Sequence, residues 1–200
     1  MHAAVTACML RNMPVRRSVT PGYTVIYPNR EKAASKLTKL VVVLIMLVSV
    51  ALMLIVTFGA WSKLQGLKPV SFVWAIAYVL IAYFIWRRWA RGLLPIAAAL
   101  AILALIMAVI AGTGASGTSW FDRSNFGFAP AQSIFGGNGL SADTLGALTV
   151  LMIPVQGLLL LFATIGFSQG WNVELEVPAD EARRRGYRVS GPPPPQPAPA

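Results

Sequence analysis

The sequence has very few of the residues that bind metals or form disulfides. Among its 200 residues there is one cysteine, Cys8, and one histidine, His2. A single cysteine cannot form an intramolecular disulfide, and one His with one Cys cannot build a His/Cys metal site within the chain. We therefore expect no metal and no other cofactor. Both residues precede Met13, a plausible alternative start, so we assign no function to the first 12 residues.

Charged residues are also scarce. They make up 12% of the chain, against about 25% in a typical soluble domain, and they fall outside four long apolar stretches. This pattern predicts an all-α integral membrane protein. A net charge of +10 is often typical of nucleic-acid binding. Here the basic residues flank the apolar stretches, as membrane topology requires, so we expect a lipid bilayer as partner and no nucleic acid.

Each of the four apolar stretches is long enough to cross the hydrocarbon core, about 30 Å thick, as a helix. They are residues 40–60, 70–86, 93–111 and 145–167. We expect a helix that starts at Asn29, as its N-cap, and runs without a break into the first span. Ser141 is the expected N-cap of the fourth helix.

These spans divide the chain into three parts. A basic tail, 1–28, precedes a transmembrane domain, 29–171, and a second tail, 172–200, follows it. The last tail ends in GPPPPQPAPA, a composition typical of disordered or polyproline-II segments, so we expect it to be disordered. Between the third and fourth spans lies a long loop, 112–140, rich in Gly, Ser and aromatic residues.

The distribution of lysine and arginine predicts the orientation in the membrane. Cytoplasmic flanks carry an excess of these residues. Of the 17 in the chain, 14 lie in the two tails, in the helix start before residue 40, or in the turn between the second and third spans. The other three are Lys63, Lys68 and Arg123. We therefore expect both termini in the cytoplasm and the loop 112–140 outside.

Three polar residues, Ser49, Tyr78 and Gln156, lie near the middle of their own spans. An amide without a partner in hydrocarbon is costly, so Gln156 should face another helix or a water-filled cavity. Pro154 removes a backbone hydrogen bond two residues earlier and predicts a kink. The freed carbonyl and the Gln156 amide would together line a small polar site. We interpret these residues as interhelical hydrogen-bonding partners; the alternative is a permeation or binding site.

Small residues form a candidate packing face on the third span. Their spacing of 4, 3, 4 and 3 residues places them on one side of a helix, where they let another backbone approach closely. They are Ala97, Ala101, Ala104, Ala108 and Ala111. This face is expected to pack against another helix of the chain or against a partner subunit.

The basic cluster Arg87, Arg88 and Arg91 follows the second span directly. We interpret it as a topology anchor; the alternative is binding of anionic lipid headgroups. The aromatic residues of the long loop are too apolar for a freely solvated linker. They are Trp120, Phe121, Phe126, Phe128 and Phe135.

The sequence shows no arrangement of residues that is typical of catalysis. No charged residue lies inside a span, and no nucleophile, general base or nucleotide-binding fingerprint stands in the required context. We therefore expect a non-enzymatic accessory, assembly or scaffolding component of a membrane complex, working through a membrane protein partner or a homo-oligomer. The alternative is an oligomeric small transporter or channel with Gln156 and Pro154 near the pathway. The high Ala, Pro and Arg content favours a bacterial inner membrane.

Overall fold

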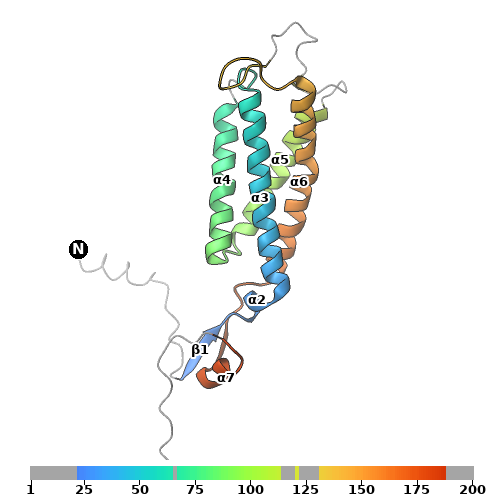
Figure 1. Ribbon diagram of the computed structural model, residues 1–200. Coiled ribbons are helices and arrows are strands. Elements are labelled where there is room, and N and C mark those ends of the chain that lie inside the picture. Colours follow the sequence, from blue (N-terminus) through green and yellow to red (C-terminus); the bar gives the residue numbers. More distant parts are fainter. Residues whose placement is uncertain (1–21, 65–66, 114–119, 122–130, 188–200) are drawn as a thin grey trace, which may run out of the picture. The chain divides into compact units, whose positions relative to one another are not determined.

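Four long helices form the larger of two compact units. The computed structural model describes residues 22–64, 67–113, 120–121 and 131–187. The larger unit comprises Asn29–Val173, and its long helices are α3 (Ala33–Gly59), α4 (Lys68–Arg88), α5 (Leu93–Thr113) and α6 (Ala142–Ser168) (Figure 1). All four are long and apolar enough to cross a membrane. This confirms the prediction of four long apolar helices and is consistent with an integral membrane protein.

The two ends of this unit differ in how the helices are connected. We call the end where α3 and α5 finish and α4 and α6 begin the loop end, because the long loop lies there. We call the opposite end, where a turn at residues 89–92 joins α4 to α5, the turn end. Ser141 caps α6 at the loop end, since its hydroxyl oxygen accepts a hydrogen bond from the Thr144 N–H. The predicted N-cap is thus confirmed.

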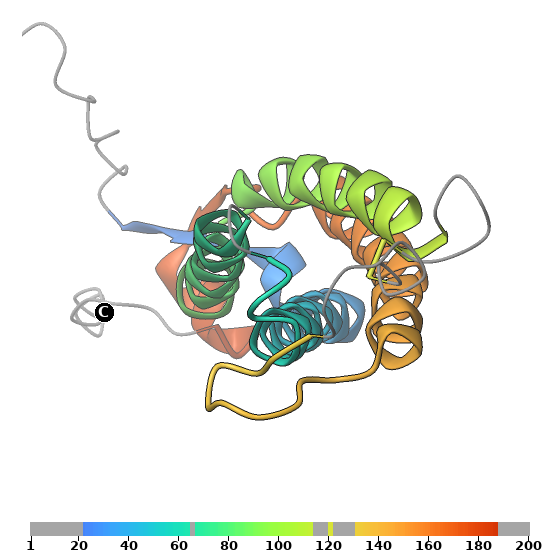
Figure 2. The ribbon, with the colours of Figure 1, turned by 90° about the horizontal axis from the view of Figure 1, so that it is seen from above.

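The four helices pack in the order α4, α3, α6 and α5. Helix α3 lies against both α4 and α6, and the most extensive contact is between α5 and α6. By contrast α4 and α5 touch little, although they are consecutive in the chain. The view down the bundle shows the reason, because α5 slants away from α4 after the short turn and comes to lie along α6 (Figure 2).

The alanine face of α5 explains why this helix follows α6. Four of the five predicted alanines are buried, and Ala111 is half-buried. Ala97 and Ala101 share a buried cluster with Leu159 and Ala163 of α6, and Ala108 shares one with Met152. The close approach continues at Gly112, where an added Cβ would lie 2.9 Å from Val150 Cγ2. Small side chains therefore allow the backbones of α5 and α6 to come together where lipid provides no hydrophobic driving force.

The expected continuous helix from Asn29 into the first span is wrong. A short helix, α2 (Pro28–Glu31), is separated from α3 by Lys32, whose backbone is extended with φ −61° and ψ 132°. Asn29 lies within α2 and is not an N-cap. Its side-chain amide donates to the Gly170 carbonyl at 3.1 Å, a tertiary contact that outweighs the local helix propensity.

The smaller unit comprises Met1–Pro28 and Glu174–Ala200. Its described part contains β1 (Tyr23–Ile26) and β2 (Leu175–Pro178), which pair antiparallel with Tyr23 opposite Pro178, followed by α7 (Ala179–Arg184). The prediction of a disordered tail therefore fails for residues 172–187, and the chain is not entirely α-helical. Residues 1–21 and the proline-rich 188–200 lie outside the described residues.

A two-stranded sheet is marginal alone, and the smaller unit supplies additional contacts. Helix α7 packs on both strands, with Ala179 and Ala182 buried. The Tyr27 hydroxyl also donates to the Glu174 carboxylate at 2.9 Å, next to the paired strands.

Replacing Ala101 with leucine should weaken the α5–α6 contact. Ala101 is fully buried, and extra methylenes in a well-packed site cost about 1–3 kcal/mol. We expect a lower unfolding temperature in detergent, measured by circular dichroism. The control is Ala99→Leu on the exposed side of the same helix, because both changes keep a strong helix former. Equal unfolding temperatures for the two variants would contradict the assignment of the packing face.

Candidate functional site

The three predicted mid-span polar residues meet in the centre of the bundle. Gln156 of α6 donates from its side-chain nitrogen to the Ser49 hydroxyl of α3 at 3.0 Å. Its side-chain oxygen accepts a hydrogen bond from the Tyr78 hydroxyl of α4 at 2.8 Å. All three side chains are fully buried. One amide therefore links three of the four long helices.

This polar cluster uses its hydrogen-bonding groups internally. The Ser49 hydroxyl donates to the Ile45 carbonyl, one turn earlier in α3, at 2.9 Å. The Tyr78 hydroxyl is the donor to Gln156, so the proton of each hydroxyl has a protein acceptor. Such an arrangement is typical of helix-to-helix hydrogen bonding in membranes. It supports the structural interpretation of Gln156 over a role in which the amide binds a solute.

Pro154 does not belong to this cluster. Helix α6 continues through it, and the proline is exposed whereas Gln156 is fully buried. Residues two apart lie about 200° apart around a helix, so Pro154 and Gln156 face opposite sides of α6. Val150, which carries the carbonyl freed by the proline ring, is 40% exposed. The expected joint polar site of Pro154 and Gln156 is therefore not formed.

At the turn end, two cations bind the carbonyls on which α4 and α6 finish. Arg91 donates from Nε to the Phe167 carbonyl at 2.7 Å, and its guanidinium lies 4.3 Å from the centre of the Phe167 ring. Lys39 donates to the Trp86 carbonyl at 3.1 Å. Cations at helix C-termini satisfy unpaired carbonyls and interact favourably with the helix dipole. Arg87 and Arg88 are exposed and do not share this role.

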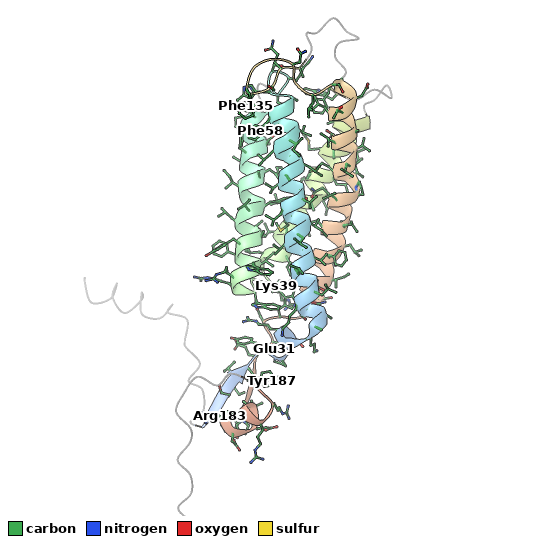
Figure 3. The ribbon with its side chains drawn as sticks, in the orientation of Figure 1. Glu31, Lys39, Phe58, Phe135, Arg183 and Tyr187 are labelled. Atoms are coloured by element: carbon green, nitrogen blue, oxygen red, sulfur yellow. The ribbon has the colours of Figure 1, made fainter. Side chains whose placement is uncertain are left out.

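A tryptophan cluster surrounds the Lys39 ammonium. Its nitrogen lies 3.9 Å from the centre of the Trp89 ring, within cation–π range. Trp89 in turn packs edge-on against Trp171, with ring centres 5.3 Å apart. The fully buried Trp171 donates to Gln169, which donates to Thr38 of α3. Figure 3 labels Lys39 at this end of the helices.

Sequence reasoning missed this cluster. The available signal was the placement of a lysine just before one apolar stretch and of Trp89 and Trp171 just after two others.

At the loop end, residues 131–140 are fixed to the end of α3. The Ile134 and Leu140 amides donate to the carbonyls of Phe58 and Gly59. Gly139 is required there, since an added Cβ would collide with the Gly59 carbonyl oxygen. Phe135 lies at the tip of this loop (Figure 3) and is 91% exposed, the most exposed large apolar side chain among the described residues. Phe126 and Phe128 lie outside the described residues.

Between α4 and α5 a cleft of about 400 Å³ opens at the loop end, and α3 and α6 also line it. Its walls are almost entirely apolar and include Leu52, Ala104 and Phe121. The hydroxyls in its walls donate to carbonyls four residues earlier in the chain, as Thr149 does to Leu145. Trp74 also lines the cleft. Its indole nitrogen is the single buried side-chain nitrogen or oxygen without a hydrogen-bond partner in the described part.

No family of known proteins and no curated protein or solved structure matches the chain. The described residues contain no group of three or more His, Cys, Asp and Glu side chains arranged to hold a metal ion. The candidate sites are therefore those that the geometry itself defines: the polar cluster, the turn-end cations, the exposed loop tip and the cleft.

Replacing Gln156 with leucine should destabilise the bundle without preventing insertion. The change removes the acceptor of the Tyr78 hydroxyl and the donor to Ser49, and hydrogen bonds of this kind contribute about 0.6–2 kcal/mol in membranes. We expect a lower free energy of unfolding in mixed micelles.

A double-mutant cycle with Tyr78→Phe isolates the hydrogen bond, because Gln156→Leu should cost less once the hydroxyl is absent. Thr164→Val is the control, since the exposed Thr164 bonds only within α6. Strictly additive effects of the Gln156 and Tyr78 changes would refute the coupling.

Proposed function

We propose that this chain is a non-enzymatic membrane protein that works by association, as an accessory, assembly or scaffolding component of a membrane complex. The supporting observation is the loop 131–140, which holds Phe135 almost fully exposed while its backbone is bonded to α3. Aromatic side chains are enriched where protein interfaces form, and they carry much of the binding energy. A pre-ordered loop also loses little entropy when a partner binds.

The proposed setting is a bacterial inner membrane with both termini in the cytoplasm. The excess of lysine and arginine on one side supports this orientation. The turn end, with Arg87, Arg88 and Arg91, then faces the cytoplasm, and the loop end with Phe135 faces outward. In this orientation the partner would meet Phe135 outside the cell membrane or at its outer interface.

The rival function, an oligomeric transporter or channel, requires polar groups near mid-membrane that are available to a solute. The Gln156 amide is already engaged with Ser49 and Tyr78, and Pro154 faces away from it. These contacts favour association over transport.

The orientation predicts which positions a membrane-impermeant maleimide can reach. In a Cys8→Ser background, Asn138→Cys at the loop end should be labelled in intact cells. Arg88→Cys at the turn end should be labelled only after lysis. Both side chains are exposed, so reactivity is comparable. Labelling of position 88 in intact cells, with position 138 protected, would reverse the proposed topology.

Phe135→Ser should reduce partner binding by about tenfold or more, since truncation of a central aromatic typically costs about 2 kcal/mol. The measurement is quantitative mass spectrometry of proteins purified with the tagged chain in mild detergent. Val173→Ser, which changes an exposed apolar residue at the turn end, is the matched control. A partner must be lost with Phe135→Ser and kept with Val173→Ser; identical protein sets for both variants speak against the proposal.

A further inference from the structure

The two strands of the smaller unit pair in a defined hydrogen-bonding phase. In an antiparallel pair, residues bonded to the opposite strand alternate with residues whose backbone N–H and C=O groups point outward. The Ala179 N–H donates to the Gly22 carbonyl at 3.0 Å, one step beyond the paired strands. Two residues further along each strand, Thr24 and Val177 therefore form the next bonded pair. This phase determines which residues each strand presents at its outer edge.

The outer edge of β1 is open. Tyr23 and Val25 alternate with the bonded residues, so their N–H and C=O groups point away from β2. These groups have no hydrogen-bond partner among the described residues, and Tyr23 is 46% exposed. Strand β1 also contains no charged residue and no proline, the features by which proteins usually prevent an edge strand from pairing.

The outer edge of β2 has both of these protective features. Its outward residues are Glu176 and Pro178, which lie opposite Val25 and Tyr23. Proline has no N–H to donate to a further strand, and the exposed Glu176 places a charge at this edge. Addition of a further strand is therefore favoured on the β1 side of the sheet.

The β1 edge is complementary to a second copy of itself. In an antiparallel register centred on Thr24, Tyr23 lies opposite Val25 of the other copy, and Val25 lies opposite its Tyr23. Every outward N–H and C=O of these residues in both copies then has a partner. An aromatic residue opposite a β-branched one is also a favourable cross-strand pair. The two copies are related by a two-fold axis, the commonest symmetry of protein oligomers.

We propose that two copies of this chain associate through β1, which joins their two-stranded sheets into one sheet in the order β2–β1–β1–β2. A two-stranded sheet is marginal alone, whereas a larger sheet with a hydrophobic face can be stable. A two-fold axis perpendicular to the membrane gives both copies the same orientation. Their smaller units then lie on one side of the bilayer, where confinement to one layer raises their effective concentration over that of a free peptide. This association goes beyond the proposed function, because it uses a surface distinct from Phe135.

Disulfide cross-linking in a Cys8→Ser background tests the register. In the joined sheet Thr24 faces Thr24 of the other copy as a non-hydrogen-bonded pair, with Cα atoms about 4.5 Å apart. That distance lies within the range of about 4.4–6.8 Å that a disulfide bridges. We expect Thr24→Cys to give a covalent dimer when membranes that contain the full chain are oxidised with copper phenanthroline. The control is Glu176→Cys, an exposed position on the protected edge of the same sheet, which should stay monomeric. Phe135→Ser should leave the Thr24→Cys cross-link unchanged, which separates this contact from the proposed function.

Proline substitution tests the hydrogen bonds of the edge. Val25→Pro removes an N–H that points away from β2, so the hydrogen bonds between β1 and β2 are kept while those to a second β1 are lost. We expect this change to abolish the Thr24→Cys cross-link and to convert the dimer mass of the purified full chain into a monomer mass in native mass spectrometry. Glu176→Pro is the matched control, because it introduces the same residue directly opposite Val25 and should leave the dimer intact.

Three results would overturn the proposal. They are a Thr24→Cys chain that does not cross-link or cross-links no more than Glu176→Cys, a dimer that persists in Val25→Pro, and an equal loss of the dimer in Glu176→Pro. Addition of a strand from a different protein would appear as a heteromeric mass that Val25→Pro removes, and it too would refute self-association.

Discussion

Buried polar groups in an apolar bundle must find their partners inside the protein, because hydrocarbon offers none. Gln156 meets this constraint most completely, since one amide accepts from Tyr78 and donates to Ser49. The same hydrogen bonds fix the rotation of α3, α4 and α6 about their axes, because a turned helix would leave a buried polar group unpaired. The alanines of α5 then complete the packing through shape alone, with no hydrogen bond to this cluster.

The constraint also explains how the helix ends are built. The last carbonyls of a helix have no partner within it. At the turn end, Arg91 and Lys39 donate to carbonyls of α6 and α4, and at the loop end the amides of Ile134 and Leu140 donate to the end of α3. Both ends are thus held by contacts between segments distant in sequence. This fixation makes the exposure of Phe135 informative, since the residue projects from an anchored loop.

Much of this architecture could be predicted from the sequence, since it depends on local signals. Charge-free runs of about 20 residues predict spanning helices, and the 4-and-3 spacing of alanines predicts one face of α5. The positions of Ser49, Tyr78 and Gln156 near the centres of their spans also indicated a shared depth. Their mutual hydrogen bonds depend on how each helix is rotated about its axis. A polar residue at mid-span limits that rotation, but it does not specify which residue will be its partner.

The features that the sequence does not predict depend on contacts between segments that lie far apart in the chain. Pairing of β1 with β2 joins two four-residue strands from opposite ends of the chain, and neither strand has a pattern strong enough to indicate its partner. The break at Lys32 arises where Asn29 binds the Gly170 carbonyl, beyond the reach of helix propensity.

The cleft has a similar origin. A short turn predicts that α4 and α5 are neighbours, but the small residues of α5 draw it onto α6, and separation towards the loop end is the geometric consequence. The packing that stabilises one helix pair thus creates the opening beside another, and apolar side chains line it.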